Sequence, residues 1–357
     1  MSARSTHLTA PVQPLLLMAI VIVSGLLLST NGFAGSPETK RALEHATALL
    51  ATGDADAAIA TLQKSLDSTP SAEVYHLLGH IYFKAKKKPQ EAAEAFTHAL
   101  KLKPAYPDAL NDLAEVYLAQ GKTSEAEQTL KRAVEIEPKH EDSYLDLARL
   151  YESRHQFGAA IQVYQRLLAV RPASADGLFG LAMLYEGQGN NASARELLAR
   201  LTRSQPKHAD GWYQAGRLAE QSNDLLEAAY AYRQAIAAKP NLVDAHYNLG
   251  FILRSQNKPT EAEREFLEVI RYRPEYAEAH MNLGVIYTSM NKLEEAEQEY
   301  EKAVALKPDY AEAHYNLGVF YELHRKDMPR ALAQYHKYRN LGGRDDRVER
   351  IIGTAGR

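Results

Sequence analysis

Few residue combinations in this sequence could carry out chemistry. The stretch AQGKT at 119–123 could end a phosphate-binding loop, but Val116 stands where such a loop needs its first glycine, and no strand precedes it. The stretch HED at 140–142 lacks the second histidine of a zinc-protease helix. The absence of cysteine excludes disulfides, thiolate catalysis and cysteine metal sites. We therefore expect a protein that is not an enzyme and has no metal site and no cofactor.

A histidine and an asparagine recur in one phrase that the chain repeats. DAHYNLGFIL at 244–253 returns as EAHMNLGVIY at 278–287 and as EAHYNLGVFY at 312–321, each copy 34 residues after the last. The histidines are His246, His280 and His314, and the asparagines are Asn248, Asn282 and Asn316. Imidazoles that share a metal ion each lie about 2.0–2.1 Å from it, whereas packed helices lie about 8–10 Å apart. We therefore expect the histidines to pack between helices and not to bind a metal.

The same 34-residue period extends far beyond this phrase. Eight closing prolines keep it without exception: Pro70, Pro104, Pro138, Pro172, Pro206, Pro240, Pro274 and Pro308. Each is preceded at the same distance by an alanine: Ala58, Ala92, Ala126, Ala160, Ala194, Ala228, Ala262 and Ala296. Together with a second small residue earlier in most copies, this pattern predicts helical hairpins that each end at a proline. Two copies carry one extra residue, which we assign to their hairpin turns at 86–89 and 324–327.

These repeats resemble the tetratricopeptide repeat family. The family pattern is a large residue, Leu-Gly or Leu-Ala, a tyrosine three residues on, an alanine in the second helix, an aromatic four residues later and a final proline. The copy at 277–310 matches it with His280, Leu283, Gly284, Tyr287, Ala296, Tyr300, Ala303 and Pro308. The resemblance implies an all-α fold, an α-solenoid in which about nine hairpins stack into a right-handed superhelix over residues 36–344. Residues 345–357 would form a capping helix or tail.

Composition limits the partners of such a solenoid. The 357 residues carry a net charge of −3 and a pI near 6.5, so no basic face indicates nucleic acid binding. A hydrophobic content of 45% is sufficient for a fold in which each repeat packs only on its neighbours.

The first 35 residues differ from the repeats. Arg4 precedes an apolar run at 15–28, and Gly32 and Ala34 provide small residues at −3 and −1 of a cleavage site. As a helix the run would span about 21 Å, less than the roughly 30 Å of bilayer hydrocarbon. We interpret residues 1–35 as a signal peptide, with an uncleaved membrane anchor as the alternative. Either predicts an exported protein, periplasmic or anchored in the inner membrane and facing the periplasm.

The asparagines stand at a repeat position that faces the concave groove in the family. We number each copy so that the histidines occupy position 4 and the asparagines position 6. The repeats are similar there to the arms of O-linked N-acetylglucosamine transferases, whose asparagine ladder holds the backbone of an extended peptide. A carboxamide offers both a donor and an acceptor to a peptide unit. The resemblance implies the same role here, and the alternative is a family pattern without a ligand.

Neighbouring positions of repeats five to nine add aromatic, methionine and arginine residues, a composition typical of interfaces. The expected peptide groove contains Phe179, Met183, Tyr213, Arg217, Tyr247, Asn248, Phe251, Arg254, Met281, Asn282, Tyr315 and Asn316. The alternative is that the rings at position 5 pack against the first helix of the neighbouring repeat. In repeats three and four the same face is acidic, with Asp112, Glu115 and Asp146.

These features predict a non-catalytic exported scaffold that binds an extended segment of a protein partner and supports assembly of an envelope complex. One alternative is a carbohydrate-handling module of an exopolysaccharide or envelope machine, with aromatic side chains such as Trp212 stacking on sugars. Another is a targeting arm for a glycosyltransferase carried on a separate chain. Peptide binding, oligosaccharide binding and co-purifying transferase activity distinguish the three. The N-terminal segment would also allow membrane association.

Overall fold

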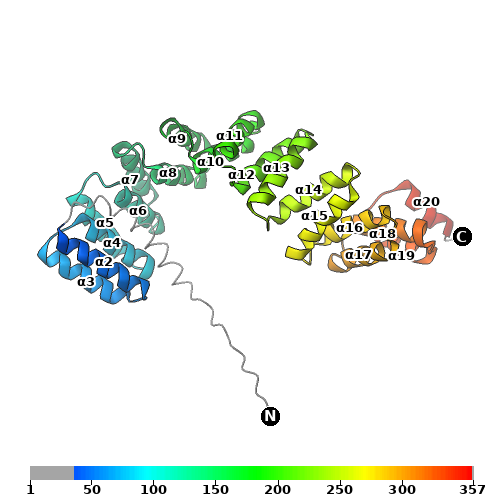
Figure 1. The fold of residues 1–357 in the computed structure, drawn as a ribbon, viewed down its shortest axis with the longest axis horizontal. Helices are drawn as coiled ribbons and strands as arrows, with labels where there is room; N and C mark the ends of the chain where they lie inside the picture. Colours follow the sequence, from blue (N-terminus) through cyan, green and yellow to red (C-terminus); the bar gives the residue numbers. More distant parts are fainter. Residues whose placement is uncertain (1–35, 356–357) are drawn as a thin grey trace, which may run out of the picture. The chain divides into compact units, whose positions relative to one another are not determined.

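The computed structural model describes residues 36–355, and within them it consists of nineteen α-helices without a strand. Consecutive pairs of helices form nine hairpins (Figure 1). The prediction of an all-α solenoid of about nine hairpins is thereby confirmed. The segment expected to be a signal peptide or anchor lies outside the described residues. Among the helices that are described, none is long and apolar enough to cross a bilayer.

Each hairpin consists of a first helix, a short turn and a second helix. The first helices are α2 (Pro37–Ala51), α4 (Ala72–His80), α6 (Pro107–Ala119), α8 (Glu141–Ser153), α10 (Ala175–Gly187), α12 (Ala209–Gln221), α14 (Val243–Ser255), α16 (Ala277–Ser289) and α18 (Ala311–Phe320). The second helices are α3 (Ala55–Ser68), α5 (Pro89–Leu102), α7 (Thr123–Ile136), α9 (Phe157–Val170), α11 (Asn191–Ser204), α13 (Leu225–Ala238), α15 (Pro259–Tyr272), α17 (Leu293–Leu306) and α19 (Met328–Asn340). A last helix, α20 (Asp346–Ala355), follows the ninth hairpin.

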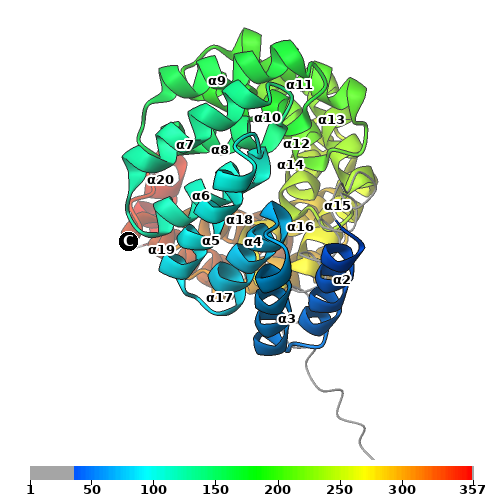
Figure 2. The same ribbon diagram turned by 90° about the vertical axis from the view of Figure 1, so that its left-hand side faces the viewer.

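The described chain divides into two compact units, which meet in sequence within α10 at residues 177 and 178. In the first unit α2 packs on α3 and α4 on α5, while α5 contacts α6 and α7 contacts α8. Figure 2 looks onto this unit and shows α2 and α3 side by side. In the second unit the same alternation runs from α11 to α19, and α20 packs on α19. Within each unit a hairpin is thus stabilised by its neighbours along the chain.

Small residues let the two helices of a hairpin approach closely. The alanines of the second helices are buried, and Ala296 has no exposed surface. In α16 the facing residue is Gly284, where an added Cβ would lie 2.6 Å from the ring of Tyr300. The same conflict would arise at Gly216, 2.7 Å from the ring of Tyr232. Glycine at these two positions therefore lets the aromatic ring of the second helix pack directly on the first helix.

The extra residues of the second and last copies lie within first helices and not in hairpin turns. The helix α4 continues into a π-helical turn, η2 (Ile81–Ala85), and α18 continues into η3 (Tyr321–Arg325). The assignment to longer turns is therefore wrong, because a π-helical turn absorbs an added residue without ending the helix. The helix α4 also begins one residue sooner after its proline than the other first helices do, which keeps Gly79 against Phe96.

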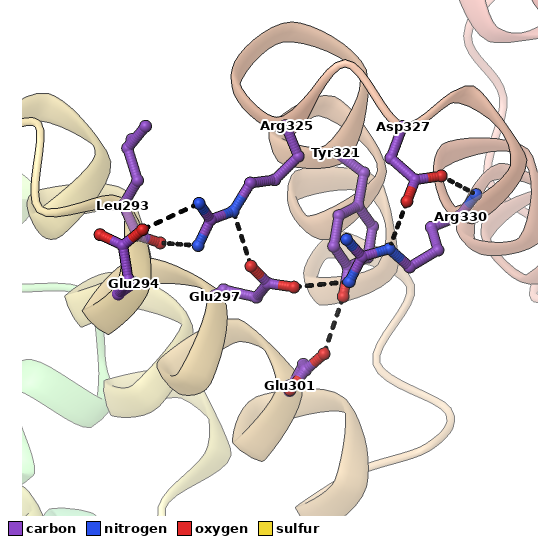
Figure 3. A network of polar contacts seen from close by, with 8 residues as sticks. All are labelled: Leu293, Glu294, Glu297, Glu301, Tyr321, Arg325, Asp327 and Arg330. Carbon is purple, nitrogen blue, oxygen red and sulfur yellow. Dashed lines mark hydrogen bonds and ion pairs between the residues drawn. The ribbon is translucent and has the colours of Figure 1, made fainter.

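The turn η3 contributes an ion-pair network that joins the last two hairpins of the second unit (Figure 3). Arg325 lies 2.6 Å from Glu297 and 3.0 Å from Glu294, and its Nη2 donates to the carbonyl of Leu293 at 3.2 Å. Arg330 of α19 lies 2.6 Å from the other oxygen of Glu297. Isolated surface ion pairs contribute about 0–1 kcal/mol. Two guanidinium groups that share one carboxylate instead fix the geometry of this contact.

Candidate functional site

Positions 5, 6, 9 and 12 of the first helices form a surface that we call the first-helix face. In the second unit Phe251 is its most open aromatic residue, with 42% of its surface exposed. Nine of the expected groove residues are half-buried: Phe179, Met183, Tyr213, Arg217, Tyr247, Asn248, Arg254, Tyr315 and Asn316. Met281 and Asn282 are instead buried, with exposed fractions of 3% and 1%. The prediction that these two line an open groove is wrong.

Neighbouring side chains bury Met281 and Asn282. Met281 packs with Ala303 of α17 and Ala313 of α18. The carboxamide of Asn282 accepts a hydrogen bond from Arg254 and donates to the carbonyl of Glu278 at 2.7 Å. Its hydrogen-bonding groups therefore bind this chain and are not free for a peptide.

The two other asparagines are also bonded within the chain. Asn248 donates to the hydroxyl of Tyr232 at 3.1 Å, and Asn316 donates to the carbonyl of Glu312 at 3.0 Å. Asn316 also lies 3.5 Å from the sulfur of Met281, one repeat earlier. The predicted ladder is therefore a row of contacts within and between repeats, and only its half-buried members retain accessible surface.

The rings at position 5 pack mainly on second helices and on the loops between hairpins. Tyr213 lies 5.8 Å from Tyr232, and Tyr247 lies 5.7 Å from Phe266 and 5.3 Å from Tyr276, measured between ring centroids. Burial raises the pKa of Tyr213 and of Tyr247, so both phenols stay neutral and can donate hydrogen bonds. These tyrosines combine a packing role with a half-buried polar edge.

Two arginines of the first-helix face in the second unit, Arg254 and Arg217, are held in place by neighbouring side chains. The guanidinium of Arg254 lies 4.9 Å from the ring centroid of Phe251, within cation–π distance. Arg217 lies 3.5 Å from Glu186 and donates to Gln214 at 2.7 Å. An exposed ring beneath a positioned cation can bind an apolar side chain next to a carbonyl or carboxylate.

The recurring histidines are buried, as expected, but they also form polar contacts that the sequence analysis missed. The ring of His246 lies 2.8 Å from Glu265 through Nδ1 and 2.9 Å from the carbonyl of Pro240 through Nε2. His280 repeats both contacts, at 2.5 Å from Glu299 and 2.8 Å from the preceding proline carbonyl. Because a carboxylate and a carbonyl only accept hydrogen bonds, these contacts favour the imidazole that carries hydrogens on both ring nitrogens, which is the charged form. We call these arrangements histidine clips.

The electrostatics of the histidine clips agree with this assignment. Burial disfavours the charged imidazole, but the hydrogen bonds to Glu265 and Pro240 outweigh it and raise the pKa of His246. Burial likewise opposes ionisation of Glu265, whose pKa is nevertheless lowered by the hydrogen bond from His246. In the last repeat His314 meets Gln334 at 2.7 Å in place of a glutamate. A glutamate 19 residues after the histidine was the signal available in the sequence.

The three acidic residues expected on the first-helix face of the first unit, Asp112, Glu115 and Asp146, all have partners within the chain. Asn111 donates to Asp146 at 2.6 Å, and Arg149 pairs with the same carboxylate at 3.0 Å. Glu115 pairs with Lys84. The expected anionic surface is therefore partly neutralised by its own neighbours.

Asp112 lies between two histidines that the sequence analysis did not single out. Its Oδ2 lies 2.6 Å from His76 Nε2 and 2.8 Å from His80 Nε2. Burial opposes its ionisation, but the hydrogen bonds from both imidazoles hold the pKa of Asp112 well below its usual value. The signal in the sequence was HLLGH at 76–80, which places two histidines one helical turn apart.

Family models identify the repeats directly. Models described as tetratricopeptide repeat match residues 43–106, 84–150, 152–215 and 243–276, and a model described as TPR repeat matches 216–253 and 284–324. The chain belongs to the tetratricopeptide repeat family. No curated protein sequence matches this tetratricopeptide repeat protein.

Several solved structures are similar to this tetratricopeptide repeat protein at low sequence identity. The crystal structure of YrrB, described as a TPR protein with an unusual peptide-binding site, is 22% identical, with a TM-score of 0.47 over 52% of this chain and 95% of YrrB. MamA from Desulfovibrio magneticus RS-1 is 23% identical, with a TM-score of 0.44 over 47% of this chain and 94% of MamA. The pilF protein of Pseudomonas aeruginosa is 17% identical, with a TM-score of 0.48 over 60% of this chain and 96% of pilF.

Proposed function

We propose that this tetratricopeptide repeat protein is a non-catalytic scaffold that binds an extended segment of a partner protein on the first-helix face of its second unit. Stacked repeats present extended surfaces suited to protein partners. The observation that carries the proposal is the exposed ring of Phe251 beside Arg254, flanked by the half-buried Tyr213 and Tyr247. Aromatic and arginine side chains dominate the energetics of protein interfaces.

The internal contacts of the asparagines change which residues provide affinity. With Asn282 buried and bonded to Arg254, a ladder of three free carboxamides does not hold the peptide. The anchors are instead Phe251, the edges of Tyr213 and Tyr247, and the cations of Arg217 and Arg254. The preferred segment would therefore combine apolar side chains with carboxylates, which suit arginine.

Selection from a displayed random-peptide library, followed by affinity measurement on the full chain, tests this function. Phe251→Ala should weaken the selected peptides by about 2 kcal/mol, as expected for an interface hot spot. Leu226→Ala is a matched control, because Leu226 is 79% exposed but lies on the second helix α13. Equal losses in the two variants, or binding to a glycan panel with no peptide enriched, would contradict the proposal.

Export and a role in assembling an envelope complex belong to the same proposal. The support is the apolar run at 15–28 followed by small residues at 32 and 34. Cell fractionation together with N-terminal sequencing of the mature protein provides the test. We expect the protein in the periplasm, or in the inner-membrane fraction if the segment is retained. An intact N-terminus in the cytoplasmic fraction would exclude both forms of export.

A further inference from the structure

Three side chains with metal-binding chemistry converge in the first unit. His76 and His80 lie one turn apart on α4, and Asp112 lies opposite them on α6. One nitrogen from each imidazole and one carboxylate oxygen all lie within 4.8 Å of one another. These residues stand at positions 5 and 9 of the second repeat and position 6 of the third, so the cluster is part of the first-helix face.

Packing holds both imidazoles in this arrangement. The ring of His80 meets the ring of Phe96 edge-on, with centroids 5.7 Å apart and an interplanar angle of 88°. The ring of His76 lies 5.6 Å from Phe96 and 4.8 Å from Tyr106. Phe96 is fully buried, and it can approach α4 because Gly79 has no side chain. The two nitrogens are thus positioned by the core of the hairpin.

We propose that His76, His80 and Asp112 form a binding site for a divalent transition-metal ion, with Zn²⁺ as the ion best suited to the donors. Two imidazoles and a carboxylate are a donor set that zinc sites use, with a water or another ligand in the fourth position. Ligand bonds of about 2.0–2.1 Å in a tetrahedron place donor atoms roughly 3.3 Å apart. The Nε2–Oδ2 distances of 2.6 and 2.8 Å therefore need to widen by roughly 0.5–0.7 Å to admit the ion. The two imidazole nitrogens, which lie within 4.8 Å of each other, need to reach a similar separation of roughly 3.3 Å.

The surroundings supply the remaining requirements of such a site. The hydroxyl of Tyr106 lies 3.0 Å from His76 Nδ1, so it can accept the Nδ1–H that remains when Nε2 binds a metal. The side chains of His80 and Asp112 are each 20% exposed, which leaves solvent access for a fourth ligand. The nearby cation Lys84 is paired with Glu115, which offsets its repulsion of a metal ion.

Zinc titration of the untagged full chain, after removal of metals with a chelator, tests the site. In competition with a chromogenic chelator we expect one high-affinity Zn²⁺ per chain and a higher thermal unfolding midpoint with metal, because the ion binds the folded state. Co²⁺ in place of Zn²⁺ should give the intense visible absorption of a four-coordinate ion. This spectrum reports on the wild-type site without any substitution.

Variants locate the ion. His80→Gln and Asp112→Asn should each abolish the high-affinity equivalent, and Tyr106→Phe should weaken it by about 10–100-fold through loss of the hydrogen bond to His76. His98→Gln is the matched control, because this exposed histidine of the same unit stacks on Tyr75 away from the cluster. Circular dichroism checks that each variant is folded. If Zn²⁺ does not bind, or if binding survives in His80→Gln, the three residues form only a hydrogen-bonded cluster and the proposal is wrong.

Discussion

The two units place different chemistry on equivalent positions of the same first-helix scaffold. In the first unit these positions carry charged groups and imidazoles that contact the next repeat, as His76 does with Asp112 and Asn111 does with Asp146. In the second unit position 5 carries mainly aromatic rings, and these pack on second helices. The backbone repeat therefore fixes where a side chain can point, while residue type decides whether it joins two repeats or packs within one.

Histidine–carboxylate pairs show this difference most directly. In the second unit His280 and Glu299 are both buried within one hairpin, with exposed fractions of 5% and 8%. In the first unit His140 contacts Asp108 of the preceding hairpin at 2.9 Å, and the carboxylate is 58% exposed. A buried pair excludes the water that would compensate for a lost partner, so the two pairs should respond differently to the same substitution.

Removing the histidine from each pair should produce the largest difference between the units. His280→Ala should lower the free energy of unfolding by about 3 kcal/mol, near the lower end of the range for breaking a buried pair, because Lys302 still contacts Glu299 at 2.7 Å. His140→Ala should cost no more than about 1 kcal/mol, as for other exposed pairs. Urea unfolding followed by circular dichroism measures both values. Equal losses would show that burial does not determine how much each histidine–carboxylate pair contributes to stability.

The regular features of the repeat could be predicted from the sequence. Contacts that depend on how each helix is rotated about its own axis could not. The burial of His280 followed from its place among large packing residues. Its partner Glu299 lies across a hairpin turn, so finding it required knowing how α16 and α17 are rotated against each other. The face of Asn282 was also predictable, but its coverage by Arg254 depends on a side chain from the preceding repeat. HLLGH at 76–80 places His80 one turn after His76, but their shared partner Asp112 comes from the next repeat, which the spacing alone does not reveal.

Substitutions of the asparagines distinguish contacts that stabilise the fold from contacts to a partner. Asn282→Ala should lower the free energy of unfolding by about 1–3 kcal/mol, because it removes the buried hydrogen-bond partner of Arg254. Asn316→Ala should cost about 0.5–1.5 kcal/mol, the usual value of a single hydrogen bond, since Asn316 is half-buried. Unfolding curves and peptide affinities of both variants provide the measurement. A loss of peptide affinity in Asn282→Ala without a loss of stability would restore the ladder as a contact surface.

The smallest expected effect is the pH dependence of the stability that the histidine clips contribute. The second unit contains its own reference for this effect, because His314 contacts the uncharged Gln334 where His246 and His280 contact glutamates. The pKa of His246 is raised above its ordinary 6.5, so its contribution to stability is complete below that pH and is lost as pH rises through the folded-state pKa. The pKa of Glu265 is lowered from 4.5, so its contribution is present above that pH and is lost as pH falls through the folded-state pKa. The clip therefore stabilises the fold most between pH 4.5 and pH 6.5, where both contributions are complete. Arg264, 3.1 Å from Glu265, also faces the pair but keeps its charge throughout this range.

Substitution of the clip glutamates should make these repeats behave like the last one. Glu265→Gln combined with Glu299→Gln gives both histidines the amide partner that His314 has in Gln334. Near pH 6 each substitution should cost about 1 kcal/mol, the difference between a charged and a neutral hydrogen bond. This cost should shrink as pH rises, because the wild-type imidazoles lose their protons and with them the charged contact. Urea midpoints from about pH 6 to about pH 9, across the range in which histidine titrates, measure the difference between wild type and variant. Parallel curves would mean that the clips are neutral hydrogen bonds throughout, whereas Gln334→Glu should steepen the dependence if they are charged.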